Sequence, residues 1–220
     1  MGTVLLIRHG QSTANASGIL AGRAPGVLLD EVGVASAKNL SPRLQQVPLA
    51  QVVTSPLERT KQTSEHLFSG QIPLEEDERL IECDYGSWQG RLLSDLATEP
   101  LWDKVQNAPE TMVFPDGERM ADMAERAIAC IREWDQALTI QHGENVIWAA
   151  VSHGDVIKAI CADALNLPLG NFQRISIEPL SISVVQYSSE VSRLHKLNDT
   201  GLQWLDSLTK MSQSKATVGG

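Results

Sequence analysis

Short apolar runs alternate with longer amphipathic stretches along the chain. The runs that predict buried strands are Val4–Ile7, Gln51–Thr54 and Val146–Val151. Helical spacing of apolar residues predicts helices over Asp30–Gln46, Ser55–Phe68, Gly117–Ile140 and from Asp155 to about Leu165. Strands that alternate with helices are typical of βαβ units. The pattern therefore predicts an α/β fold with a mostly parallel sheet covered by helices on both faces.

The remaining segments are less regular. Pro42 is expected to bend or interrupt its helix, and Asp95–Gln106 predicts a helical stretch broken around Pro100. Ser181–Tyr187 and Val191–Leu197 predict a final hairpin. We expect a single domain over residues 1–205 and a disordered tail over 206–220, which is rich in Ser, Thr, Lys and Gly.

Charge and composition limit the classes of partner. The 220 residues include 27 acidic and 18 basic side chains, which gives a net charge of −9. A strongly acidic chain lacks the general electrostatic attraction that nucleic acids and anionic membrane surfaces require. No apolar run approaches the ~18 residues that a membrane span needs. We therefore expect a soluble, cytoplasmic protein that binds neither nucleic acid nor membrane, whose three cysteines (Cys83, Cys130 and Cys161) are reduced core thiols.

Candidate chemistry gathers where the predicted strands end. His9 follows the first strand and His153 follows the strand at Val146–Val151. The carboxyl ends of parallel strands line the ligand crevice of an open sheet, so both histidines are expected to face one cleft. Arg59 lies in the first turn of the helix after the second strand, where an anion is favoured. With Arg8, it could clamp such an anion.

Each of these side chains also has a structural interpretation. A single His after a strand is more often a hydrogen-bonded structural residue, and a single Arg on a first helical turn is usually solvated. Gathering two arginines without a ligand is electrostatically unfavourable, however, which favours a functional anion site. Ser12 and Asn15, in the loop after the first strand, would add neutral donors to the same oxyanions.

A metal site is the main chemical alternative at the same place. It would be built from His9, Glu82, His153 and Asp155, because imidazole and carboxylate suit zinc or iron. Arg8 argues against it. A guanidinium repels a divalent cation, whereas its planar fork suits phosphate.

Four motifs in order resemble those of the histidine phosphatase superfamily, also called the phosphoglycerate mutase-like family. The motifs are Arg8–Gly10, Ser55–Thr63, Leu80–Gly90 and Ser152–Gly154, and the resemblance extends over about residues 1–200. It implies a three-layer αβα sandwich and a phosphohistidine mechanism that uses no metal or other cofactor. The implied catalytic residues are His9, Glu82, His153, Arg8 and Arg59, and the implied phosphate-binding residues are Arg8, Ser12, Asn15, Arg59, His153 and Gly154.

The implied roles are chemically consistent. A neutral imidazole nitrogen of His9 can attack phosphorus if the phosphoryl charge is neutralised, which two guanidiniums and a protonated His153 would do. Glu82 must start protonated to supply the leaving alkoxide with a proton, and a partly buried carboxyl that faces a phosphate dianion has a raised pKa. Glu82 would then activate the water that hydrolyses phosphohistidine.

Departures from the family pattern bear on the substrate. Gln11 and Arg119 stand where many relatives have Glu and Ser, so the roles carried by those positions are open. Residues 18–26 do not resemble the corresponding loop of cofactor-dependent phosphoglycerate mutases, and the segment after Glu82 lacks their longer insert. The sequence thus favours a phosphatase acting on a small phosphorylated metabolite. A phosphomutase and a protein-directed, weakly catalytic member stay open, as does a homodimer.

Specificity is expected to reside in two segments, residues 16–28 and 85–115. Aromatic and Arg side chains there are candidates for a substrate lid, with core packing or surface charge as the stronger interpretation. These candidates are Arg23, Tyr85, Trp88, Arg91 and Trp102.

Overall fold

The computed structural model describes residues 2–68, 70, 72–188 and 191–201. Within them, one six-stranded sheet has the order β3-β2-β4-β1-β5-β6. Its strands are β1 (Thr3–Arg8), β2 (Leu49–Thr54), β3 (Leu74–Glu76), β4 (Ile147–Ser152), β5 (Ile182–Gln186) and β6 (Arg193–Asp199). The predicted tail at 206–220 lies outside the described residues.

The sheet is mostly parallel, as the alternation of strands and helices predicts. β1 pairs with β4, β4 with β2 and β2 with β3, all in parallel. β5 adds antiparallel to β1, and β6 antiparallel to β5, so the predicted final hairpin is confirmed. β6 begins two residues later than its apolar pattern predicts, and residues 189–190, between the two strands, are outside the described part.

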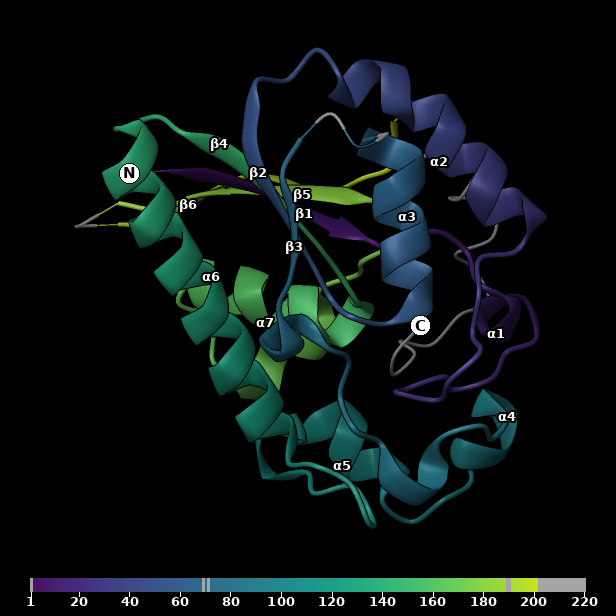
Figure 1. Ribbon diagram of the computed structural model, residues 1–220. Coiled ribbons are helices and arrows are strands. Elements are labelled where there is room, and N and C mark those ends of the chain that lie inside the picture. Colours follow the sequence, from purple (N-terminus) through teal and green to yellow (C-terminus); the bar gives the residue numbers. More distant parts are fainter. Residues whose placement is uncertain (1, 69, 71, 189–190, 202–220) are drawn as a thin grey trace.

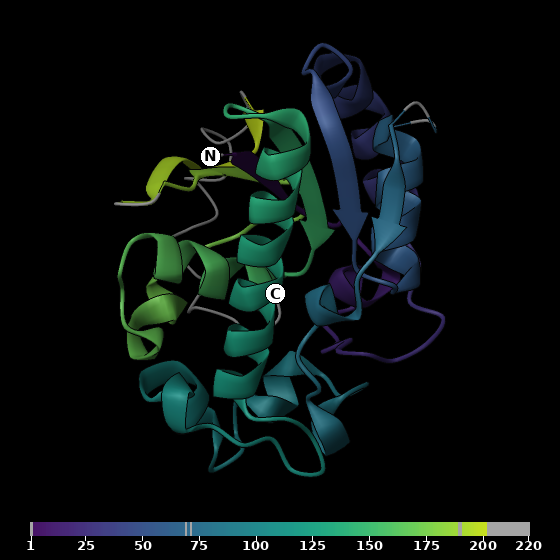
Figure 2. The same ribbon diagram turned by 60° about the vertical axis from the view of Figure 1, so that its left-hand side comes forward.

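Helices cover both faces of the sheet, which confirms the three-layer α/β fold (Figures 1 and 2). The main helices are α2 (Glu31–Leu44) and α3 (Glu58–Phe68) on one face, and α6 (Met120–His142) and α7 (Gly154–Ala164) on the other. The shorter helices are α1 (Thr13–Ala16), α4 (Leu93–Leu96) and α5 (Trp102–Asn107). In the described ranges, no helix is both long and apolar enough to cross a membrane.

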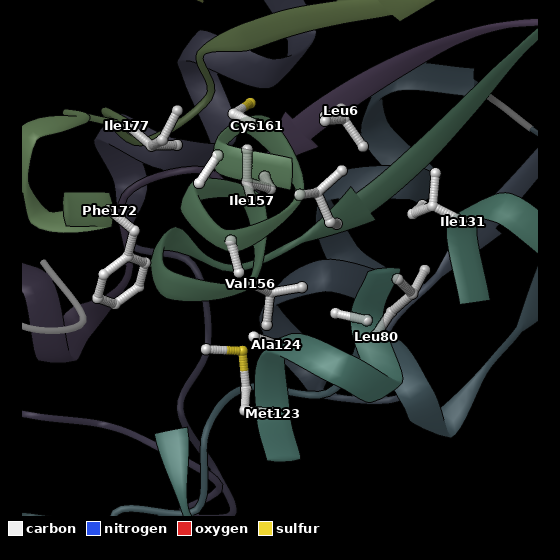
Figure 3. Packing of buried hydrophobic residues seen from close by; sticks show 14 of the residues in the cluster. Leu6, Leu80, Met123, Ala124, Ile131, Val156, Ile157, Cys161, Phe172 and Ile177 are labelled. Carbon is white, nitrogen blue, oxygen red and sulfur yellow. The ribbon is translucent and has the colours of Figure 1, made fainter. Parts of the chain in front are cut away.

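Successive residues of β1 belong to two different hydrophobic cores, one on each face of the sheet, because side chains of a strand point to alternate faces. Val4 and Leu6 pack with α6 and α7, whereas Leu5 and Ile7 pack with α2 and α3. Figure 3 shows the larger core, where side chains from α6 meet those of α7 beneath Leu6. A strand buried on both faces is held firmly, and its carboxyl end is a rigid place for a site.

Three helices depart from the sequence pattern. α3 begins at Glu58 rather than directly after Ser55-Pro56, and the carbonyl of Leu57 accepts its first bonds. α6 begins at Met120, because the chain before it makes a tight turn in which Phe114 N bonds to the carbonyl of Glu118. α2 continues through Pro42 to Leu44.

One strand was not predicted from the sequence. β3 has three residues, Leu74–Glu76, and all three are exposed at the edge of the sheet. A short exposed edge strand has no alternation of buried and polar residues to reveal it.

Two irregular segments pair beside the carboxyl ends of the strands. Leu20 N bonds to the carbonyl of Arg91, Gly90 N bonds to that of Leu20, and Leu93 N bonds to that of Gly18. α4 and α5 both lie at this end of the molecule, in teal in Figure 1, and the helical stretch from residue 95 to 106 is broken as predicted. The two segments expected to set specificity are therefore in contact.

The three cysteines are all buried and free, as predicted. Burial raises the pKa of each thiol above its ordinary value. They belong to the larger core.

Candidate active site

The parallel register of β1 and β4 brings the two predicted histidines together. Arg8 pairs with Ser152 across these strands, and His9 N donates to the carbonyl of Ser152 at 3.0 Å. The rings of His9 and His153 lie with their centroids 5.3 Å apart at 61°. Both histidines are almost completely buried.

Arg59 connects the two rings. Its Nε donates to Nε2 of His9 at 3.2 Å, and its Nη2 contacts Nδ1 of His153, also at 3.2 Å. The same Nη2 donates to the carbonyl of Gly22 at 2.8 Å. The first turn of α3 thus reaches the site as the sequence predicts.

These contacts fix the tautomers, because a guanidinium can only donate. Nε2 of His9 and Nδ1 of His153 must both accept. Nδ1 of His9 is then free to donate to the carbonyl of Gly10 at 2.7 Å, and Nε2 of His153 donates to Oγ of Ser55 at 2.7 Å. Both rings are neutral in this arrangement.

The surroundings favour the neutral rings. Burial, together with the charges of Arg59 and Arg8, holds the pKa of His9 well below its ordinary value. Burial and the charge of Arg59 do the same to His153. The sequence predicts a protonated His153, but the protein alone favours the neutral ring. The positive charges that would attract a phosphate also repel a positive charge on His153.

Buried guanidinium donors without partners mark the centre of the site. Nη1 of Arg8 donates to the carbonyl of Ile177 at 2.7 Å. Nε and Nη2 of Arg8, and Nη1 of Arg59, have no hydrogen-bond partner in the described part of the protein. Both side chains are only 1% exposed. Unpaired buried donors are costly, and an anion between them would satisfy them.

Glu82 lies near the same charges. It is buried, and its Oε1 accepts from the backbone N–H of Cys83 at 2.9 Å. Burial, aided by the negative charge of Asp155, raises its pKa to about 7, against the opposing effects of the Cys83 N–H and of Arg59 and Arg8. A carboxyl with this pKa can hold a proton near neutrality, as a general acid must.

Asp155 belongs to a separate buried network. Its carboxylate accepts from the hydroxyl of Tyr85 at 2.8 Å and from Lys158 at 3.1 Å. No group of three or more His, Cys, Asp or Glu side chains within the described ranges is arranged to hold a metal ion. The four residues considered for a metal site therefore do not form a ligand set in this structure.

The other predicted phosphate-binding residues lie on neighbouring helix starts. Ser12 and Asn15 bond to each other in a capping box at α1, where Oδ1 of Asn15 accepts from the hydroxyl of Ser12 at 2.8 Å. Gly154 is the first residue of α7, directly after His153. Among the described residues, Ser12 and Asn15 bond neither to the histidines nor to Arg59.

Positions that depart from the family pattern have structural partners. Nε2 of Gln11 donates to the carboxylate of Asp30, the N-cap of α2, at 2.9 Å. Arg119 is exposed at the start of α6 and pairs with Asp122 at 3.5 Å.

Most of the lid candidates prove to be structural. Tyr85 and Trp88 are buried in the larger core, and Trp102 packs against it. Arg91 pairs with Glu99 at 2.6 Å. Arg23 differs, because its Nε donates to the carbonyl of Glu82 at 2.8 Å.

The sequence did not single out Ser55, Gly22 or Arg126 for the site. Ser55 is the first residue of the motif Ser55–Thr63, so the motif could have identified it as a site residue. Gly22 and Arg126 come from a loop and a long helix that contact the site only in the folded chain.

Comparison with known proteins finds similar proteins over most of the chain. The family model described as "Histidine phosphatase superfamily (branch 1)" matches residues 4–200. A Yersinia pestis protein named "Probable phosphoglycerate mutase GpmB" is 28% identical over 187 residues, which are 84% of this chain and 84% of that protein.

Solved structures share the fold. YhfR from Bacillus stearothermophilus superposes with a TM-score of 0.81 at 28% identity, over 90% of this chain and 98% of that one. The alpha-ribazole phosphatase from Shigella flexneri gives a TM-score of 0.77 at 26% identity, over 90% and 97% of the two chains.

Proposed function

Because the chain belongs to the histidine phosphatase superfamily, branch 1, whose members are phosphatases or phosphomutases, we propose that it is a metal-independent phosphatase. Its substrate is a small phosphomonoester metabolite, and the reaction proceeds through a phosphohistidine at His9. The site geometry supports a tetrahedral anion, and similarity to the alpha-ribazole phosphatase of Shigella flexneri supports hydrolysis.

The observation that carries the proposal is the set of unpaired donors on Arg8 and Arg59. The charges of both guanidiniums act on His9, and both carry buried N–H groups that have no partner among the described residues. Such donors suit the equatorial oxygens of a phosphoryl group in transfer. They act beside an imidazole that burial and charge keep neutral. A neutral imidazole is the form that can attack phosphorus.

The reaction has two steps. Nε2 of His9 gives up the hydrogen bond from Nε of Arg59 and attacks phosphorus while the ester P–O bond breaks, and Glu82 gives its proton to the leaving oxygen. In the second step the ionised Glu82 takes a proton from water, whose oxygen attacks phosphorus and breaks the P–N bond. Inorganic phosphate leaves, and both His9 and Glu82 return to their starting states. The bond from Nδ1 of His9 to the carbonyl of Gly10 keeps Nε2 as the nucleophile throughout.

Phosphate release from a panel of phosphorylated metabolites, in the presence of a chelator, tests the proposal. We expect release by the native protein and none by His9→Ala, with acid-labile, base-stable phosphate on His9 during turnover. His142→Ala, at the exposed end of α6, is the matched control and should retain full activity. Undiminished activity of His9→Ala would exclude the mechanism.

A phosphomutase is the second candidate. It is favoured by the name of the Yersinia pestis relative and by the burial of the site, where His9, Arg59 and Glu82 are each at most 3% exposed. Exclusion of water protects phosphohistidine from hydrolysis and allows return to substrate. Isomerised product in excess of free phosphate would favour the mutase.

A further inference from the structure

Two arginine side chains from distant parts of the chain hold the backbone of Glu82. Its carbonyl accepts from Nε of Arg23 at 2.8 Å and from Nη2 of Arg126 at 3.2 Å. Arg23 belongs to the loop after α1, and Arg126 belongs to α6. Neither side chain donates to the Glu82 carboxyl in the described structure, so both act on the backbone that carries it.

Arg126 also fixes the residues before Glu82. Its Nη1 donates to the carbonyls of Arg79 and Ile81, at 2.7 Å each. The short 3-10 helix at Glu78–Leu80 ends just before this point, so no regular backbone ladder continues through Glu82. One guanidinium therefore holds three carbonyls within four residues of chain.

Glu118 joins the two arginines. Its Oε2 accepts from Nη2 of Arg23 at 2.9 Å, and its Oε1 accepts from Nη2 of Arg126 at 2.7 Å. Oε1 also accepts from the backbone N–H of Asp84 at 3.1 Å, on the other side of Glu82. The three charged side chains are 19–29% exposed, so water screens them only in part.

We propose that Glu118 is a positioning residue for the catalytic acid, acting through Arg23 and Arg126 on the backbone of Glu82. This inference rests on the proposed function, because it presumes that Glu82 donates the proton. General acid catalysis needs the carboxyl within hydrogen-bond distance of the leaving oxygen. A loop without a backbone ladder provides that precision only if side chains hold it.

The arrangement also links the acid to the phosphate site. Arg23 directly follows Gly22, whose carbonyl accepts from Arg59. The loop that holds the Glu82 backbone is therefore the loop that contacts the phosphate-binding guanidinium. The backbone N–H of Arg23 donates to Oε1 of Gln89, which holds this loop independently of Glu118. Loss of Glu118 is therefore expected to disturb proton donation and to leave Arg8 and Arg59 with their present partners.

The test separates proton donation from all other steps by changing the leaving group. Nitrophenolate departs without a proton, whereas an alkoxide needs one. With enzyme in excess, Glu118→Gln should slow phosphorylation of His9 by an alkyl phosphate about 10-fold to 100-fold, part of the ~10²–10⁴ that a general acid contributes. Phosphorylation by nitrophenyl phosphate should change less than about threefold, because the acid contributes little there.

Glu133→Gln is the matched control. Glu133 is a carboxylate on α6 that pairs with Arg79 and contacts neither Arg23 nor Arg126 in the described structure. It should leave both rates unchanged. If Glu118→Gln does not show the near-ultraviolet circular dichroism spectrum of the native protein, Arg23→Gln replaces it in the same assay. It should also slow phosphorylation by the alkyl phosphate and not by nitrophenyl phosphate.

Two outcomes would overturn the proposal in different ways. If His9→Ala is inactive but the positioning variant slows both esters equally, or neither, then the phosphatase function stands and the positioning role of Glu118 is wrong. If the native protein forms no phosphohistidine with any donor, the proposed function is wrong and the positioning role falls with it.

Discussion

The proposed site has two ends that are built by different means, a phosphate end (Arg8, His9, Arg59 and His153) and an acid end (Glu82). Arg8, His9 and His153 are placed by the carboxyl ends of two paired strands, and Arg59 by the first turns of α3. Glu82 lies in an irregular segment whose backbone is held by side chains from elsewhere in the chain. The first end is fixed by the sheet, and the second by a small set of charged contacts.

Because of this difference, we expect the geometry of the two ends to respond differently to substitutions. Side chains carried by strand ends and helix starts are held more precisely than side chains on loops. An irregular segment held by hydrogen bonds from arginine side chains can shift when one of these bonds is lost, so its geometry can change without loss of the fold. We therefore expect substitutions at the two ends to differ in which chemical step they slow.

The largest effect is expected at the phosphate end. Arg59→Ala removes a guanidinium with an unpaired donor and should lower kcat/KM by about 10³–10⁵, the range found for an arginine that stabilises a transferring phosphoryl group. The loss should be similar for alkyl and nitrophenyl phosphates, because both transfer the same group. Arg132→Ala, whose guanidinium pairs with Asp163 on the surface, serves as the control. A strong dependence of the Arg59→Ala loss on the leaving group would contradict the comparison.

A somewhat smaller and more selective effect is expected at the acid end. Glu82→Gln should slow phosphorylation of His9 by an alkyl phosphate about 10²–10⁴-fold, because the leaving alkoxide loses its proton donor. With nitrophenyl phosphate, the variant should release a burst of nitrophenol and then stall as phosphohistidine, since water lacks its base. Rapid-quench experiments measure the rate of phosphorylation and the burst, and the amount of acid-labile phosphate measures the phosphohistidine that accumulates. Steady release without a burst would argue against Glu82 in the second step.

The smallest effect concerns pH. The raised pKa of Glu82, about 7, keeps most of its carboxyl protonated below neutral pH, so kcat/KM for an alkyl phosphate should fall as pH rises above about 7. The fall should approach tenfold per pH unit. Because the pKa of His9 is lowered, protonation of its ring should limit the rate only at a pH well below the ordinary pKa of histidine. Glu82→Gln should lack the alkaline limb; a native rate that climbs steadily to pH 9 would show that another group supplies the proton.

The phosphate end was predictable from the sequence because it depends on local order. Apolar runs identify β1 and β4, and the residues after parallel strands must meet at one edge. The sequence therefore predicts that His9 and His153 lie together, and the start of a helix after β2 predicts that Arg59 lies near them, as the structure shows.

The acid end was predictable in identity but not in construction. Glu82 came from a recognised motif, whereas Arg126 is a polar position on an amphipathic helix, where solvent exposure is the ordinary expectation. Its contacts to three carbonyls depend on how α6 crosses the irregular segment. No periodicity carries that information. The tight turn before α6, which sets the position of Glu118, displaced the predicted helix start for the same reason.

The carbonyl of Gly22 orients the guanidinium of Arg59 before any substrate binds. It accepts from Nη2 at 2.8 Å, so Nη2 is occupied, and Nη1 is the nitrogen left without a partner in the described part of the protein. A donor that is held in place in advance needs no reorganisation during the reaction. The loop at Gly22 therefore selects which edge of the guanidinium faces the phosphoryl group.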